Sequence, residues 1–313
     1  VSLKQAIFAY IKSMRSYLFF LSGMAGLLGI VFSGVSPSWW RVTTVLSILF
    51  IGWGVNQVIN DLLGLREDRI NAPHRPLVTG ELSIKFAVLL SVLFFFLGGI
   101  VTYFLNPCAL FLYTAVFLLN IIYEYAKRIP LFGNIVFGFL LAPCVYYGAM
   151  CINNKGLEIL KDRNLFLFSL GVILVNITVA FFTYYKDYCG DNATGNKTVI
   201  VYLTPNKAKY LNFFMGFLPF IVLILLMTNF RFNPVFLLLT MLNLIILEYT
   251  AFLFFRNPQG KETYYSLKWN FRGAVLFKTA FIALVNPLLA GILYVFNFLA
   301  VGILFDLHRD HLA

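Results

Sequence analysis

The sequence predicts an all-α, polytopic membrane protein, a bundle of about nine transmembrane helices around a central cavity. Its 313 residues are 60% hydrophobic and only 12% charged, whereas a soluble domain averages roughly 25% charged residues. The apolar residues also fall in long blocks, and a block of about 20 residues spans the hydrocarbon core of a bilayer. Such a segment must be helical, because its backbone polar groups find no water there.

Nine blocks are long enough to span a membrane. We expect spans at residues 17–37, 42–64, 83–105, 107–126, 132–152, 165–185, 209–229, 234–255 and 276–305. The last block contains Pro287 and is long enough to be tilted or broken. Together these spans form a single transmembrane domain over residues 1–313.

Segments outside the blocks have their own expected roles. Residues 1–15 alternate basic with apolar side chains, which predicts an amphipathic helix at the membrane interface. This segment is not expected to be a signal peptide, because no small-residue cleavage site follows a short apolar run. Residues 65–82 and 186–206 are expected to be loops that cap the bundle on its cytoplasmic side.

The distribution of charge predicts the orientation. With nine spans, 18 of the 24 Lys and Arg residues fall on the same face as the N-terminus. The positive-inside rule then puts the N-terminus in the cytoplasm and the C-terminus on the opposite face, in what we expect to be the cell membrane. The net charge of +11 is explained by these interfacial residues. Since no nucleic-acid-binding motif is present, a nucleic-acid partner is not expected.

Carboxylates gather at the ends of two blocks. Of the thirteen acidic residues, Asp61, Glu67 and Asp68 lie within eight residues at the end of the second block, and Asp187 and Asp191 lie at the end of the sixth. Both ends are cytoplasmic in the expected topology. Ionisable groups beside a membrane are costly, so two such clusters on one face indicate a functional site.

Helical spacing aligns these oxygens. On an ideal helix Asn60, Asp61 and Asp68 fall within an arc of about 100°, and Asp187 and Asp191 stack at i and i+4. Either cluster alone could be a helix cap. Oxygen donors without a Cys or His cage suit Mg²⁺, which binds a few carboxylates together with substrate phosphate oxygens. The predicted metal ligands are Asn60, Asp61, Asp68, Asp187 and Asp191.

Basic side chains surround both clusters. They are Arg66, Arg69, Arg75, Lys127, Arg128, Lys186 and Lys197. For any single one, interfacial anchoring is the alternative interpretation. Acids for a metal and bases for phosphate, placed at a membrane face, predict a lipid-tailed phosphate or diphosphate whose apolar tail enters the bundle.

At these residues the sequence resembles the UbiA superfamily of intramembrane prenyltransferases. The resemblance covers nearly the whole chain. The family's first motif, NDxxDxxxD followed by an RP pair, is similar to Asn60-Asp61, Asp68 and Arg75-Pro76. The second motif, DxxxD with neighbouring Gly and Thr residues, is similar to Asp187, Gly190, Asp191, Gly195 and Thr198. The segment from Tyr123 to Asn134, with Lys127-Arg128 inside it, resembles the family's lysine-containing segment.

The resemblance implies Mg²⁺-dependent transfer of a prenyl group. In that reaction a prenyl diphosphate ionises, pyrophosphate leaves, and a hydrophobic acceptor attacks the allylic cation. The acceptor could be an aromatic ring, a quinone precursor, a chlorin-like alcohol or a glycerol-type lipid. The resemblance assigns catalysis to Asp68, Asp187, Asp191 and Lys127. We expect substrate contacts from Arg75, Arg69, Arg15, Arg128, Lys186, Lys197, Tyr123 and Asn176, with interhelical bonding as the alternative for Asn176.

One departure from the family pattern is Gly64, which stands where the first motif has its middle, metal-proximal Asp. Three explanations compete. Asp61 or Glu67 takes over the metal-binding role of the missing Asp, or one metal ion is held by fewer side chains and more water. Alternatively, the protein catalyses a different reaction or has lost activity. A second departure is Tyr184, which stands where some branches have an earlier Asp. The alternative function is a membrane terpene cyclase of the same superfamily, which needs no acceptor. A transporter is the alternative from another class, but the acids lie at one membrane edge rather than at the midplane.

Overall fold

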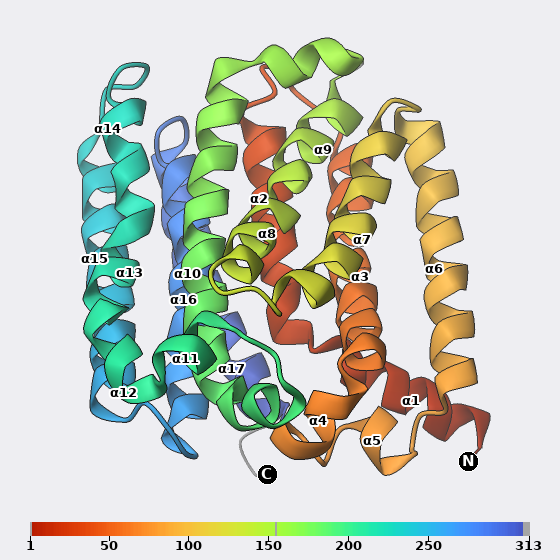
Figure 1. Ribbon diagram of the computed structural model, residues 1–313. Helices are drawn as coiled ribbons and strands as arrows, with labels where there is room; N and C mark the ends of the chain where they lie inside the picture. Colours follow the sequence, from red (N-terminus) through yellow and green to blue (C-terminus); the bar gives the residue numbers. More distant parts are fainter. Residues whose placement is uncertain (1, 154, 309–313) are drawn as a thin grey trace.

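The computed structural model describes residues 2–153 and 155–308, and within them it is a bundle of α-helices without strands (Figure 1). The long helices run along a common direction, and short helices cover one end of the bundle. In chain order the α-helices are α1 (Leu3–Met14), α2 (Phe19–Val31), α3 (Trp39–Leu63), α4 (Leu65–Asn71), α5 (Pro76–Thr79), α6 (Ile84–Leu105), α7 (Ala109–Ala126), α8 (Phe132–Leu140), α9 (Ala142–Ile152), α10 (Arg163–Thr194), α11 (Val199–Leu203), α12 (Pro205–Ala208), α13 (Asn212–Phe217), α14 (Val222–Leu226), α15 (Pro234–Arg256), α16 (Glu262–Ile282) and α17 (Pro287–Leu307).

Nine segments of the described chain are helical, long and apolar enough to cross a membrane, which confirms the expected number of apolar spans; α16 is a further, less apolar helix of the bundle. They are Leu3–Val31, Trp39–Leu63, Ile84–Leu105, Ala109–Ala126, Phe132–Ile152, Arg163–Thr194, Pro205–Leu226, Pro234–Arg256 and Pro287–Leu307. The first includes α1 and α2, joined by a single 3₁₀ turn at Ser16–Leu18.

The predicted ninth span at 276–305 is wrong in its boundaries. It joins the last third of α16 to most of α17, which are two antiparallel helices separated by residues 283–286 (Figure 1). The side chain of Asn286 caps α17, and Pro287 occupies its first turn, where a missing N–H costs no hydrogen bond. α16 contains Lys268, Arg272 and Lys278. These charged residues lower its hydropathy, so the sequence does not show α16 as an apolar block. In the structure α16 packs among α2, α10, α15 and α17, so it needs no apolar outer surface.

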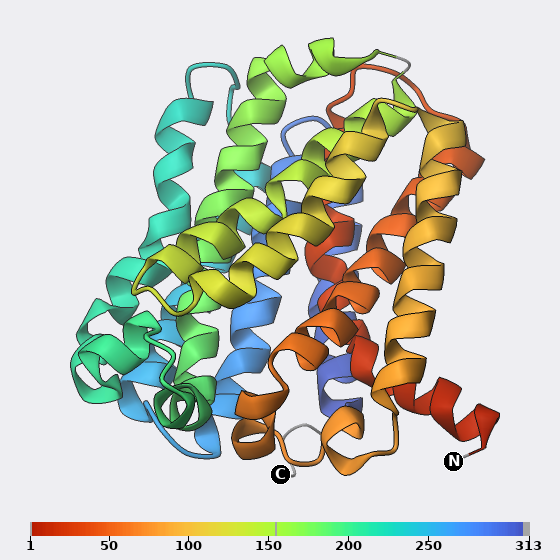
Figure 2. The ribbon, with the colours of Figure 1, turned by 45° about the vertical axis from the view of Figure 1, so that its right-hand side comes forward.

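This additional helix also overturns the prediction that the two termini lie on opposite faces. α17 returns to the end of the bundle where α1 lies, as both ribbon views show (Figures 1 and 2). The Tyr17 ring lies 4.9 Å from the Phe305 ring and 5.3 Å from the His308 ring, measured between centroids. The described chain therefore begins and ends on the same side.

The cap segments contain more helix than expected. Residues 65–82, predicted as a loop, hold α4 and α5. Within 186–206, also predicted as a loop, α10 continues unbroken to Thr194, where Gly195 ends it with a left-handed φ of 82°. α1 lies at this same end and exposes Leu3, Phe8 and Ile11 on its outer side (Figure 1). Its predicted place at the membrane interface stays a prediction, and Val1 lies outside the described residues.

Candidate active site

A cavity opens at the capped end of the bundle and narrows into its apolar interior. It encloses about 1050 Å³ of space, including its open mouth. Polar side chains around it are Arg15, Gln57, Asn60, Asp61, Glu67, Asp68, Asn71, Arg75, Glu124, Lys127, Lys186, Asp187 and Asp191. Apolar and aromatic side chains lining it include Leu18, Leu21, Trp53, Tyr123, Phe137, Val179, Tyr184 and Phe271.

The amide of Asn71 at the end of α4 joins the two acidic motifs. Its Nδ2 donates to the carbonyl oxygen of Asp187 at 3.0 Å, and its Oδ1 accepts from the backbone N–H of Gly190 at 2.7 Å. A Cβ at Gly190 would lie 2.6 Å from Asn71 Cγ, so a larger residue would force the two helices apart. Gly190 therefore allows close packing between α10 and the side chain of Asn71 at the end of α4.

A second link crosses between the same two helices. Glu67 Oε1 accepts from Asn196 Nδ2 at 2.9 Å and from Thr194 Oγ1 at 3.3 Å. Asn196 Nδ2 also lies 3.1 Å from Asp191 Oδ1. Because these bonds fasten α4 to the end of α10, both motifs line the same cavity. No periodic pattern in the sequence identifies Asn71 or Asn196, which act through contacts between distant segments.

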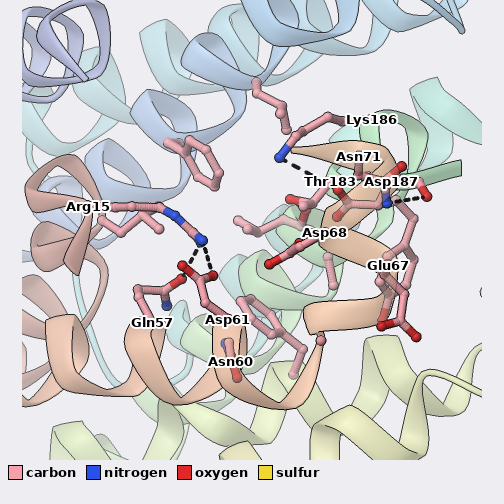
Figure 3. A pocket seen from close by; sticks show the side chains of 18 of the residues that line it. Arg15, Gln57, Asn60, Asp61, Glu67, Asp68, Asn71, Thr183, Lys186 and Asp187 are labelled. Atoms are coloured by element: carbon pink, nitrogen blue, oxygen red, sulfur yellow. Dashed lines mark hydrogen bonds and ion pairs between the residues drawn. The ribbon is translucent and has the colours of Figure 1, made fainter. Parts of the chain in front are cut away.

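Two arginines hold the first motif. Arg75 Nη1 lies 2.5 Å from Asp68 Oδ2 and 3.1 Å from Asp61 Oδ1. Arg15 pairs with Asp61 as well, and its Nη1 donates to Gln57 Oε1 at 3.0 Å (Figure 3). Arg15 adopts a left-handed φ of 53° at the junction of α1 and the next turn. That conformation costs a non-glycine residue roughly 1 kcal/mol. With this backbone, the Arg15 guanidinium points into the cavity.

The second motif faces the first across the cavity (Figure 3). Asp187 and Asp191 lie on successive turns of α10, and Asp191 is only 3% exposed. Lys186 Nζ lies 3.6 Å from Asp187 Oδ1 and 5.1 Å from the centre of the Tyr264 ring. A carboxylate pair and a cation thus stand side by side at the mouth of the cavity.

Lys127 and Glu124 complete the polar wall from the end of α7. Lys127 Nζ lies 2.6 Å from Glu124 Oε2. Burial alone lowers the pKa of Lys127, but the negative charges of Glu124 and Asp191 outweigh it and raise that pKa above its ordinary value. Lys127 is therefore a cation at neutral pH. Glu124 was missed in the sequence, although a carboxylate inside an apolar block is itself a signal of function.

The donor set suits a hard divalent cation. Among residues 2–153 and 155–308, no three His, Cys, Asp or Glu side chains form a ready-made metal site. The cavity nevertheless collects all five predicted oxygen ligands. Asn60 Oδ1 and Asp61 Oδ2 are buried without a hydrogen-bond partner, and such oxygens are costly unless a ligand satisfies them. Carboxylate and amide oxygens in this setting fit Mg²⁺.

The cavity wall takes in only part of the predicted substrate-binding set. Arg15, Arg75, Lys127, Lys186 and Tyr123 line it. The structure places four others elsewhere: Arg69, Arg128 and Lys197 are exposed outside the cavity lining, and Asn176 is fully buried. Arg128 lies over the Tyr125 ring at 5.4 Å, as an interfacial anchor would. Asn176 Oδ1 accepts from Lys278 Nζ at 3.4 Å, which is the interhelical alternative.

Comparison with known proteins gives one consistent result. The model of the UbiA prenyltransferase family matches residues 20–273. The chain is 29% identical to the digeranylgeranylglyceryl phosphate synthase of Thermococcus kodakarensis, over 91% of this chain and 98% of that protein. It is also 29% identical to the Pyrococcus furiosus enzyme of the same name, over 68% of this chain and 75% of that protein.

Solved structures show the same fold. A UbiA homologue from Aeropyrum pernix, in its apo form, superimposes with a TM-score of 0.71 at 18% identity, covering 85% of this chain and 97% of the homologue. A UbiA homologue from Archaeoglobus fulgidus, bound to DMAPP and Mg²⁺, gives a TM-score of 0.63 at 17% identity, covering 95% and 99%.

Proposed function

The chain belongs to the UbiA prenyltransferase family, and from that premise we propose that it catalyses Mg²⁺-dependent transfer of a prenyl group from an isoprenoid diphosphate to a lipophilic acceptor, releasing pyrophosphate. The observation that carries this proposal is the meeting of two acidic helix ends and several cations at the mouth of a cavity with an apolar interior. The polar mouth fits a diphosphate and its metal ions, while the apolar interior fits a prenyl chain.

The two motifs have complementary roles in this reaction. Asn60, Asp61, Asp68, Asp187 and Asp191 would hold Mg²⁺ through their side-chain oxygens. When bound, Mg²⁺ neutralises charge that develops on the departing pyrophosphate. Fastening of α4 to α10 through Asn71 keeps the two sets of oxygens facing one another.

Cationic side chains complete the diphosphate site. Arg75, Lys127 and Lys186 line the cavity beside the acids, where they would bind the oxygens of the leaving group. Charge stabilisation of this kind is strongest for groups already held in place, and Arg75 and Lys127 are held by Asp68 and Glu124. Asp68 thereby takes part in metal binding directly and in leaving-group binding through Arg75.

Deeper in the cavity the lining becomes aromatic and apolar. Tyr123 is buried against Phe137, with ring centres 5.1 Å apart, and Trp53 lies beyond them. Such a wall keeps water from an allylic cation and can stabilise that cation through ring faces. The prenyl chain would extend from the diphosphate site into this region.

For the acceptor we propose a glycerol-phosphate-type lipid. The support is the name of the curated relatives, digeranylgeranylglyceryl phosphate synthase, at 29% identity over 91% of the chain. Gly64 keeps the terpene cyclase as a second candidate, since its missing carboxylate departs from the transferase pattern. The two reactions differ in their need for an acceptor.

The proposed orientation places the N-terminus and the cavity mouth in the cytoplasm of a cell whose plasma membrane holds the bundle. α4 contains Arg66 and Arg69, and Arg75 immediately precedes α5; these helices lie at this end of the bundle (Figure 1). The positive-inside rule favours that face as cytoplasmic. Since α17 returns to it, the described end of the chain would be cytoplasmic as well.

Product analysis tests the proposal. The purified protein would be incubated with Mg²⁺ and a panel of prenyl diphosphates, with and without a geranylgeranylglyceryl phosphate acceptor. A prenylated lipid formed only when the acceptor is present supports the transferase. A cyclic hydrocarbon formed without acceptor would support the cyclase instead, and no conversion under any condition would contradict both.

A further inference from the structure

The row of oxygen ligands at the end of α3 has a gap. Asn60, Gly64 and Asp68 follow one another at intervals of four residues, so they lie on one face where α3 passes into α4. The outer two members bear side-chain oxygens and line the cavity, whereas the middle member has no side chain. Asn60 Oδ1 is buried beside this gap without a hydrogen-bond partner.

The backbone does not explain the glycine. Gly64 has a φ of −95°, which any residue adopts. A Cβ at this position would meet the carbonyl oxygen of Asn60 at 3.1 Å, a tight contact that a shift of a few tenths of an ångström relieves. A side chain at position 64 is therefore compatible with the local conformation.

Another helix supplies the missing carboxylate. Glu124 Oε2 lies 3.7 Å from the place of a Cβ on Gly64, and Lys127 Nζ lies at the same distance. Glu124 comes from α7 and is 9% exposed, with its carboxylate in the wall of the cavity. Its position is thus close to where the oxygens of an acidic residue at 64 would extend.

The other acids near the gap already have roles of their own. Asp61 is itself one of the proposed metal ligands, and its Oδ1 is paired with Arg15 and Arg75. Glu67 points toward α10, where it accepts from Thr194 and Asn196. Glu124, by contrast, pairs with Lys127, a cation that itself faces the cavity. If Lys127 turns to a diphosphate oxygen, the Glu124 carboxylate is released toward a metal ion while each charge keeps a partner.

We propose that Glu124 is a metal-binding residue of this site and replaces the carboxylate that Gly64 lacks. The inference rests on the proposed function, because it needs a divalent cation and a diphosphate in the cavity. It also gives a reason for the glycine: with Glu124 in place, an acidic residue at 64 would set two like charges side by side.

Metal binding in the presence of inorganic pyrophosphate tests this role without relying on turnover. Mn²⁺ serves as the paramagnetic probe, titrated into the full chain and followed by electron paramagnetic resonance. Since loss of a residue that only supports a metal ligand already weakens affinity roughly 10- to 100-fold, Glu124→Gln is expected to weaken Mn²⁺ binding by at least about 10-fold. The double variant Gly64→Asp with Glu124→Gln is expected to recover most of it. Glu158→Gln, the same change at an exposed site far from the cavity, is the matched control and is expected to leave binding unchanged.

A parallel titration of pyrophosphate without metal separates the metal role from mere positioning of Lys127. The proposal predicts that Glu124→Gln changes this metal-free affinity less than about two-fold. An equal loss with and without metal, or a loss that Gly64→Asp does not restore, would overturn it. So would a Glu124→Gln variant that binds Mn²⁺ like the wild type.

Two further observations keep the test decisive. If the Glu124→Gln variant does not fold, Glu124→Asp can replace it. This variant keeps the negative charge beside Lys127, but its shorter side chain moves the carboxylate oxygens away from the gap, so a several-fold weaker Mn²⁺ affinity is expected. An unchanged Mn²⁺ affinity would count against the proposal. A wild-type protein that binds no Mn²⁺ with pyrophosphate would overturn the proposed function and this inference together. A wild type that binds normally while the variants match it would overturn the inference alone.

Discussion

Replacing Gly190 with alanine should separate the two motifs. The added Cβ would lie 2.6 Å from Asn71 Cγ, so the Asn71 side chain must move away. Its two hydrogen bonds, to the Asp187 carbonyl at 3.0 Å and from the Gly190 N–H at 2.7 Å, would then be lost. At about 1 kcal/mol each, these bonds stabilise the fold by roughly 2 kcal/mol. Alanine recovers about 1 kcal/mol through its higher helix propensity, which leaves a net loss of roughly 1 kcal/mol.

The effect on ligand binding should exceed this modest loss of stability, because the displaced helix ends carry the predicted metal ligands. We expect Gly190→Ala to lower the melting temperature by a few degrees and to weaken Mg²⁺-dependent pyrophosphate binding by roughly 10-fold or more. Gly291→Ala is the matched control, since a Cβ there meets nothing within 4 Å. If Gly190→Ala has the same melting temperature and pyrophosphate affinity as the Gly291→Ala control, the Asn71 bonds do not hold the two motifs together.

Three further predictions concern charges. Asp61→Asn removes one carboxylate partner of the buried Arg15 and Arg75 guanidinium groups and should lower the free energy of unfolding by about 3 kcal/mol. Asp306→Asn changes a carboxylate that is 57% exposed and should lower it by less than about 1 kcal/mol. Equal melting temperatures for the two variants would contradict this. Arg75→Gln should weaken pyrophosphate binding by roughly 10-fold or more, a charged hydrogen-bond pair being worth about 1.5–3 kcal/mol, while the exposed Arg69→Gln should leave it unchanged; similar losses in both would mean that the cavity is not the diphosphate site. The raised pKa of Lys127 keeps this residue protonated well above neutral pH. Deprotonation of Lys127 should therefore not lower pyrophosphate affinity between about pH 7 and 9. If pyrophosphate affinity falls over this range in the wild type but not in Lys127→Met, Lys127 loses its proton there and the prediction is wrong.

Sequence patterns predicted the apolar spans well, because lipid-facing helices need long apolar blocks. They failed at α16, where Lys268, Arg272 and Lys278 resemble loop residues. That helix is enclosed by other helices, and Lys278 is fully buried with its Nζ bonded to the Leu21 carbonyl oxygen at 3.1 Å. Hydropathy cannot distinguish a polar helix buried in protein from a loop. Because this helix was missed, the described end of the chain was expected at the opposite end of the bundle from the N-terminus.

For the site, sequence reasoning succeeded where charge is rare and failed where charge is common. The acids of both motifs stood out because carboxylates are few beside apolar blocks, and the cavity collects them. Arg69 and Arg128 were included because interfacial and ligand-binding arginines look alike in one dimension. Asn71 and Glu124 were missed because their importance arises from contacts with Gly190 and Gly64, which are distant in sequence.

The two acidic motifs are proposed to form one Mg²⁺-dependent diphosphate site. Pyrophosphate release from prenyl diphosphates, measured for the wild type and for Asp187→Ala and Asp191→Ala, tests it most directly. We expect Mg²⁺-dependent release by the wild type that EDTA abolishes and that both variants lack. Release that persists in EDTA or in either variant would show that the two motifs do not form such a site, and so would a wild type that releases no pyrophosphate when a geranylgeranylglyceryl phosphate acceptor is supplied.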